Sequence, residues 1–182
     1  MTSSIPPQSQ PHQPGVERLM DPPAEHIRAD YHGSDKLKGR RALVTGGDSG
    51  IGRAAALPHF GKGSVVINTS SINAFAGNRS LVAYTTTKAA EMGFTRALAL
   101  QLAPRGIRVN AVAPGPVWTP LQPASWGPID PQAVADLGKK TPLGRIGQPS
   151  ELGPAYVYLA ARDSSYVTGQ TLHVNGGMII NG

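Results

Sequence analysis

Residues 41–57, RALVTGGDSGIGRAAAL, decide the fold expected for this chain. The first five residues form a short apolar run typical of a buried strand, the glycine-rich middle is a tight turn, and RAAAL begins a helix. A turn in this context lets the backbone approach a dinucleotide pyrophosphate closely and points helix N–H groups at the phosphates. A glycine-rich turn alone is a weak signal, so its meaning depends on the rest of the chain.

Strands and helices alternate downstream of this turn. Buried-strand patterns begin at four places along the chain: Arg41, Ser64, Ile107 and Thr171. Apolar residues at helical spacing predict helices over 83–103 and 151–161. This alternation is typical of an α/β fold, with a Rossmann-like parallel sheet of about four strands and ligands at the carboxyl ends of the strands.

The first 36 residues differ in composition from the rest. They hold six of the 17 prolines, together with Gln and Ser, and almost no periodic apolar residues. Such a composition predicts an extended, disordered and solvated arm outside the core. Residues 37–182 are then expected to form a single globular domain.

The segment 116–147 is rich in Pro, Gly and Trp. It is expected to be a long loop with one helix at 131–138. Trp118 and Trp126 lie in this loop, and either line a substrate pocket or cover an edge of the core. The sequence leaves both interpretations open.

Composition excludes several classes of protein. No stretch reaches the roughly 18 apolar residues of a membrane span, and the first residues lack the pattern of a signal peptide. The absence of cysteine excludes a disulfide framework, and the five scattered histidines lack metal-ligand spacing. The formal charge is +6, but the basic residues are dispersed, so nucleic acid is not an expected partner. We expect a cytoplasmic protein with no metal site.

Tyr84 and Lys88 stand four positions apart in the predicted helix 83–103, which places them on one face. A cation close to a phenol favours the phenolate and suits it to proton transfer. Ser71 follows the strand that begins at Ser64, where its hydroxyl can hydrogen-bond a substrate carbonyl oxygen. A Tyr–Lys pair by itself is more often an ordinary pair of surface residues. These residues therefore indicate a catalytic site only in combination with the other motifs.

In combination, these stretches resemble the short-chain dehydrogenase/reductase family. The resemblance rests on five motifs in order: TGGDSGIG at 45–52, NTSS at 68–71, the Tyr84–Lys88 pair, RVNAVAPGPVWTP at 108–120 and TGQTLHVNGG at 168–177. The sequences of the arm and of the glycine-rich turn are similar to those of the bacterial general-stress-protein branch of that family.

The resemblance implies an oxidoreductase that transfers a hydride between NAD or NADP and a small alcohol, aldehyde or ketone. Tyr84 would act as general acid/base and Ser71 as its polarising partner, while Lys88 would hold the nicotinamide ribose and tune Tyr84. The residues implied to wrap the pyrophosphate are Gly46, Ser49, Gly50, Ile51 and Gly52. Those implied to contact the nicotinamide end are Pro114, Gly115, Val117 and Thr119.

The spacing departs from the family pattern between the glycine-rich turn and Tyr84. The interval lacks about three βα units, or roughly 90–100 residues. The seam is expected near residues 57–58, so that the strands from Arg41 and Ser64 become neighbours. The absent part would hold the ribose-reading residue, the turn under the adenine and a catalytic asparagine, so impaired activity is expected.

The deletion leaves a second interpretation open. The chain could be a non-catalytic remnant that associates with full-length relatives through the 83–103 helix and the last strand. The same two surfaces would join copies in a homo-oligomer. Neither the substrate nor the choice between NAD and NADP can be read from the sequence.

Overall fold

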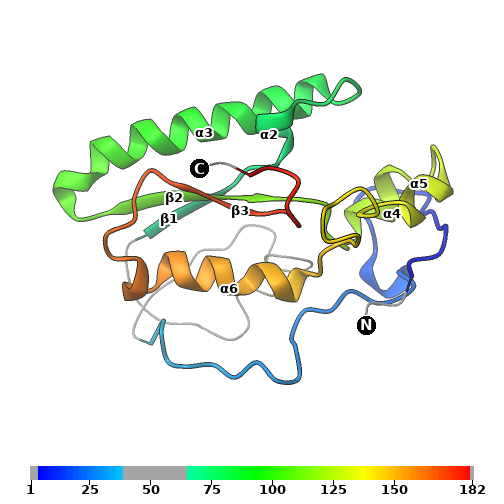
Figure 1. Cartoon of the computed structure of the whole chain (residues 1–182), viewed down its shortest axis with the longest axis horizontal. Coiled ribbons are helices and arrows are strands. Elements are labelled where there is room, and N and C mark those ends of the chain that lie inside the picture. The colour runs from blue at the N-terminus through cyan, green and yellow to red at the C-terminus, as the bar shows by residue number, and fades with distance from the viewer. Residues whose placement is uncertain (1–3, 39–64, 181–182) are drawn as a thin grey trace.

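A three-stranded parallel sheet lies between two helices in the computed structural model, which describes residues 4–38 and 65–180 (Figure 1). The strands are β1 (Val65–Thr69), β2 (Arg108–Pro114) and β3 (Thr171–Val174), in the order β1-β2-β3. The α/β fold with a Rossmann-like parallel sheet is therefore confirmed. Three of the four expected strands are present; the one from Arg41 lies outside the described residues, as does the seam at 57–58.

Strand β2 is the centre of the sheet. It pairs with β1 through contacts such as Val66 opposite Val109, and with β3 through contacts such as Val112 opposite Leu172. Its side chains from Val109 onward are buried. A central parallel strand has both faces covered, which explains its run of Ala and Val in place of an alternating pattern.

Helix α3 (Val82–Leu102) covers one face of the sheet, and α6 (Pro149–Ala160) covers the other (Figure 1). The predicted range 83–103 is thus correct to within one residue at each end. Helix α3 gives way to a 3-10 turn, η2 (Ala103–Arg105), after which Gly106 adopts a left-handed conformation with φ 68°. Proline and glycine at these positions end the helix, as the sequence predicts.

Helix α6 begins two residues earlier than expected. Pro149 occupies its first position, where proline loses no helical hydrogen bond. The Gln148 N–H donates to the Glu151 carboxylate at 2.8 Å, and Arg145 makes two hydrogen bonds to the same carboxylate at 2.6 and 2.7 Å. The Arg145 hydrogen bonds hold the pKa of Glu151 below its usual value. This ion pair fixes the start of α6.

Three short helices complete the domain: α2 (Asn73–Ala76), α4 (Leu121–Ser125) and α5 (Pro131–Ala135). The helix expected at 131–138 is present but ends at Ala135. The other two were not expected, because one is only four residues long and the other contains Pro123. A single turn of helix has too few residues to show a period.

The N-terminal arm differs from the expectation of a solvated segment. It has little regular structure, as predicted, apart from the 3-10 turn η1 (Glu17–Leu19). It nevertheless packs against the rest of the chain, because Met20 is buried in an apolar cluster with Trp118, Val134 and Ile146. The few apolar residues of the arm stand in a segment rich in Pro, Gln and Ser, so its composition predicts a solvated segment although the Met20 side chain belongs to the core.

Trp118 belongs to the core. Its side chain is completely buried beside Met20, Val134 and Ile146, and its indole N–H donates to the Pro22 carbonyl at 2.7 Å. Trp126 packs on the edge of the same cluster. Of the two interpretations of these tryptophans, the structure supports the one in which they cover an edge of the core.

Candidate active site

The three strands end at one edge of the sheet, and the chain after β1 stays paired there. The Ser70 N–H donates to the Val112 carbonyl at 2.8 Å, and the Ile72 N–H donates to the Pro114 carbonyl at 3.1 Å. These two hydrogen bonds hold Ser71 between them at the carboxyl end of β2. Ligands of parallel α/β sheets bind at this edge, so Ser71 lies where the sequence predicts.

Ser71 is nearly buried, with an exposed fraction of 7%. Its Oγ accepts a hydrogen bond of 3.2 Å from the Asn73 N–H at the start of α2. The preceding Ser70 donates its hydroxyl to the Lys88 carbonyl at 2.8 Å. The end of β1 is therefore tied directly to the turn of α3 that carries Lys88.

Lys88 lies at this strand end and beside Tyr84. Its Nζ donates to the Thr69 carbonyl at 2.7 Å and stands 5.8 Å from the centre of the Tyr84 ring. Tyr84 itself is 40% exposed, so its ring remains accessible. Lys88 and Tyr84 share one helical face as predicted, and Lys88 joins that face to the last residue of β1. The motifs also predict that the Tyr84 and Ser71 hydroxyls meet directly or through one water, and this contact stays a prediction.

Glu91 is a further charged group at this position. Its two carboxylate oxygens lie 3.0 and 3.1 Å from the Lys88 Nζ. Sequence reasoning missed it, although a carboxylate three positions after a lysine on the same helix is a recognised pairing signal. The Lys88 ammonium is thus held by a carbonyl, a carboxylate and the neighbouring aromatic ring.

Tyr156 approaches the same strand end from the opposite face of the sheet. Its hydroxyl shares a hydrogen bond of 2.9 Å with the Thr69 hydroxyl. Burial raises the pKa of Tyr156 to about 12, so the phenol is protonated at neutral pH. In the sequence it reads as an ordinary apolar position of a helix, which is why it was not singled out.

The loop after β2 carries the residues predicted to meet the nicotinamide. Pro114 pairs with Val174, and Val117 is buried and forms a bridge with Gly147. A Cβ on Gly115 would lie 2.7 Å from the Asn175 Cα, so only glycine lets the loop approach so closely. Thr119 is half-buried. The loop is thus fixed against both β3 and the segment before α6.

The predicted pyrophosphate residues lie outside the described part of the chain: Gly46, Ser49, Gly50, Ile51 and Gly52. Their role stays a prediction.

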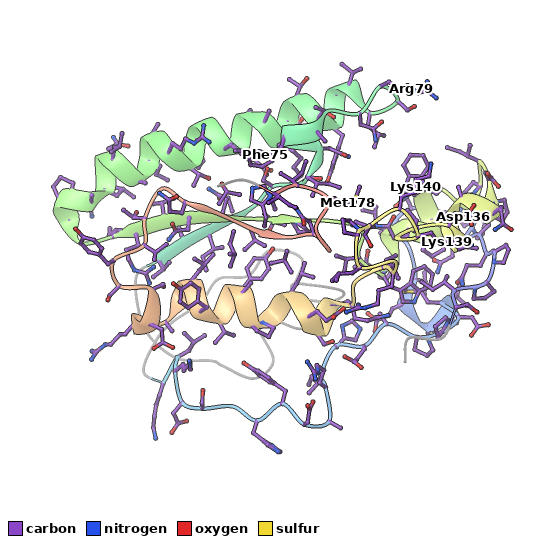
Figure 2. All side chains as sticks on the ribbon, in the orientation of Figure 1. Phe75, Arg79, Asp136, Lys139, Lys140 and Met178 are labelled. Carbon is purple, nitrogen blue, oxygen red and sulfur yellow. The ribbon has the colours of Figure 1, made fainter. Side chains whose placement is uncertain are left out.

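His173 on β3 contacts α2, the short helix that follows Ser71. Its ring packs edge-on against Phe75, with ring centres 4.4 Å apart, and Figure 2 shows Phe75 between α3 and the sheet. Burial lowers the pKa of His173. A neutral imidazole in an aromatic contact is a packing residue of the wall beside the candidate site.

Within residues 4–38 and 65–180, no three His, Asp or Glu side chains come together as a metal site. None of the helices described is long and apolar enough to cross a membrane.

A family model and several curated proteins match this chain, and all of them are oxidoreductases or stress proteins by their descriptions. The profile of the family described as "Enoyl-(Acyl carrier protein) reductase" matches residues 51–179. Glucose and ribitol dehydrogenase homolog 2 of Arabidopsis thaliana is 35% identical over 291 positions, which cover 100% of both chains. General stress protein 39 of Bacillus subtilis (strain 168) is 34% identical over 280 positions and 97% of each chain.

A solved structure agrees with these relatives. The NAD-bound 3-oxoacyl-[acyl-carrier protein] reductase from Brucella melitensis superposes with a TM-score of 0.56 at 39% identity, covering 64% of this chain and 41% of that one.

The length of the Arabidopsis alignment bears on the expected deletion. It spans 291 positions, 109 more than the 182 residues of this chain, so at least that many positions have no counterpart in it. A deficit of this size is close to the three βα units that the spacing predicts to be absent. The place of the seam stays a prediction.

Proposed function

Because this chain belongs to the short-chain dehydrogenase/reductase family, we propose that it is an NAD(P)-dependent oxidoreductase acting on the CH–OH group of a small alcohol, or on the corresponding aldehyde or ketone. One observation carries the proposal most directly. The Lys88 ammonium lies beside the Tyr84 ring and on the last carbonyl of β1. That arrangement brings a cation and an accessible phenol to the edge of the sheet where ligands bind.

The described residues fit the nicotinamide end of such a cofactor. Lys88 has three N–H donors, which face the Thr69 carbonyl and the two Glu91 carboxylate oxygens, so a ribose hydroxyl would replace one of the two Glu91 contacts. The loop at Gly115 lies against the end of β3 and forms a fixed wall nearby. The bound nicotinamide supplies or accepts the hydride. NAD and NADP remain equal candidates, and the Brucella reductase was solved with NAD.

The residues of the chain handle the proton. In the direction of carbonyl reduction, the Tyr84 hydroxyl donates a proton to the substrate oxygen, and the Lys88 ammonium stabilises the phenolate that remains. In the direction of oxidation, the phenolate accepts the proton from the alcohol. The Ser71 hydroxyl donates a hydrogen bond to the same substrate oxygen and polarises it.

We infer that catalysis is severely reduced relative to a full-length homologue. The positions without a counterpart in this chain would include the groups that hold the adenosine half of the cofactor. Losing two charge-assisted hydrogen bonds, at about 1.5–3 kcal/mol each, weakens binding by roughly two to four orders of magnitude. Hydride transfer depends on close positioning of the nicotinamide, so the rate falls together with the affinity.

The second candidate is a non-catalytic remnant that acts by association. It is favoured by the outer face of α3, where Val82, Phe94 and Leu100 are exposed. An apolar patch on a helix is typical of surfaces that meet another protein. Full-length relatives and further copies of this chain are the two partners to compare.

The test is a titration of the purified chain with NADH and NADPH, followed by nucleotide fluorescence, and a rate assay with small aldehydes and ketones. We expect saturable binding and slow turnover. Tyr84→Phe should abolish the turnover while leaving binding nearly unchanged, and Tyr166→Phe, on a fully exposed ring, is the matched control. Absence of any nucleotide binding would favour the remnant, and turnover equal to that of a full-length homologue would contradict the inferred impairment.

A further inference from the structure

The described part of the N-terminal arm, residues 4–36, is built into the segment 115–147 that follows β2. The Trp118 indole donates to the Pro22 carbonyl at 2.7 Å, and the Gln10 N–H donates to the Pro123 carbonyl at 2.9 Å. Figure 1 shows the first, dark blue part of the arm beside α4 and α5 at one end of the molecule, and its later residues running beneath α6. Hydrogen bonds thus join the arm to two places on this segment.

The arm is also packed as a core element is packed. Met20 is 5% exposed within the cluster around Trp118, and the polar side chain of Gln10 is 3% exposed. Gln10 is satisfied inside the arm, since its amide donates to the Val16 carbonyl at 2.9 Å and accepts from the Val16 N–H at 2.6 Å. A buried amide with its hydrogen bonds made is typical of a well-ordered contact.

Two glycines allow the close approach. A Cβ on Gly15 of the arm would lie 2.0 Å from the Pro120 carbonyl oxygen. A Cβ on Gly127 would lie 2.4 Å from the Ser9 Cα. Both distances are far below van der Waals contact with backbone atoms, so a methyl group on Gly15 would separate the arm from the segment. A methyl group on Gly127 would press on the arm and also, at 2.4 Å, on the Pro123 carbonyl oxygen of the segment itself.

The contact leads to the candidate site through Trp118. This residue lies between Val117 and Thr119, two of the residues predicted to meet the nicotinamide. Its backbone N–H donates to the Gly147 carbonyl at 2.8 Å, beside the bridge between Val117 and Gly147. The arm therefore holds the side chain of the residue whose backbone is part of the nicotinamide-end loop.

We propose that the arm is a positioning element of the cofactor site: by holding Trp118 through Met20 and Pro22, it fixes Val117 and Thr119 in the geometry that receives the nicotinamide. This inference rests on the proposed function. The segment 115–147 contains only short helices and would lose many contacts without the arm. Without the arm, the segment would have to become ordered when the cofactor binds, and this ordering costs conformational entropy. The cost weakens the binding of ligands that contact the loop through their nicotinamide.

The experiment uses Gly15→Ala in the full chain, with Gly93→Ala as the matched control, because a Cβ on Gly93 meets nothing within 4 Å. Docking of the arm is read by amide exchange at Gln10 and by the fluorescence of Trp118 in a Trp126→Phe background, where it is the sole tryptophan. Gly15→Ala should accelerate exchange and shift the emission to the red, and Gly93→Ala should do neither. Gly127→Ala is a second variant at the same contact, because its methyl group would meet the Ser9 Cα of the arm.

The functional readout compares NADH with ADP-ribose, which lacks the nicotinamide. Separating the arm should weaken NADH binding about tenfold, which corresponds to about 1.4 kcal/mol, and leave the affinity for ADP-ribose unchanged. Equal weakening of both ligands would mean general destabilisation and overturn the proposal. Unchanged NADH affinity with a detached arm, or an arm that neither glycine variant detaches, would also overturn it. If the parent chain binds neither NADH nor ADP-ribose, the proposed function itself is wrong. The other outcomes bear only on the role of the arm.

Discussion

Thr69 connects the two faces of the sheet at the scale of single atoms. Its carbonyl accepts from Lys88 of α3, and its hydroxyl shares a hydrogen bond with Tyr156 of α6. One residue at the end of β1 therefore couples the candidate catalytic helix to the helix behind the sheet. The stability of this connection can be measured separately from any activity.

Replacing Tyr156 with Phe should cost about 0.5–1.5 kcal/mol of unfolding free energy at neutral pH, because the hydrogen bond to the Thr69 hydroxyl is lost. The folded state raises the pKa of Tyr156 from 10.0 to about 12 and so holds this proton more tightly than the unfolded chain does. The stability associated with it is complete below pH 10 and is lost as the pH rises towards 12. Urea unfolding across this range should show a smaller decline for Tyr156→Phe. Tyr166→Phe should unfold like the parent chain.

His173 gives a second, opposite pH dependence. Burial lowers the pKa of His173 below 6.5, so the folded state disfavours the charged imidazole. The corresponding stability is present above about pH 6.5 and is lost as the pH falls through the lowered pKa. His173→Asn should flatten this part of the profile of unfolding free energy against pH, although the loss of the Phe75 contact lowers the whole curve. A profile that keeps its slope in His173→Asn but loses it in His32→Asn, on the exposed arm, would contradict the assignment.

At the scale of elements, α3 depends on what its glycines meet. Gly93 lies inside the helix with open space around its Cβ position, whereas Gly106 after the helix has φ +68°. Gly93→Ala should stabilise the protein by about 0.5–1 kcal/mol through helix propensity, and Gly106→Ala should destabilise it by about 1 kcal/mol through backbone strain. Thermal unfolding followed by circular dichroism measures both. Shifts of the same sign would show that the conformation of Gly106 is not what requires glycine.

The elements also show what sequence could predict. Strand β2 and helix α3 were predicted almost to the residue, because a long buried run and a long helical period are strong signals. The contacts of the arm were not, since Met20 lies in a segment whose Pro, Gln and Ser content predicts no core contact. The Tyr84–Lys88 face was predicted from its spacing, while Glu91, whose spacing from Lys88 carries the same kind of signal, was missed and is identified by its distance of 3.0 Å to Lys88.

At the scale of the whole molecule, the described residues form a small sheet with an apolar outer helix face. Phe94 is 55% exposed and Leu100 is 79% exposed on α3. We expect this face to be covered by a second chain, so Phe94→Glu and Leu100→Glu should shift sedimentation towards the monomer. Arg96→Glu, at an exposed polar position of the same helix, is the control for added charge. A parent chain that is monomeric at all concentrations would rule out this assembly.

The docking of the arm has a consequence for how the protein is synthesised. Pro22 receives Trp118 from 96 residues further along the chain, and Glu25 receives Ser150 from 125 residues further along. At about 5–20 residues per second, the ribosome makes Ser150 roughly 6–25 s after Glu25. Trp118, the partner of Met20 and Pro22, is itself made late in that interval. Until then the arm is open to proteases and chaperones, so its docking has to follow the synthesis of most of the residues downstream of it.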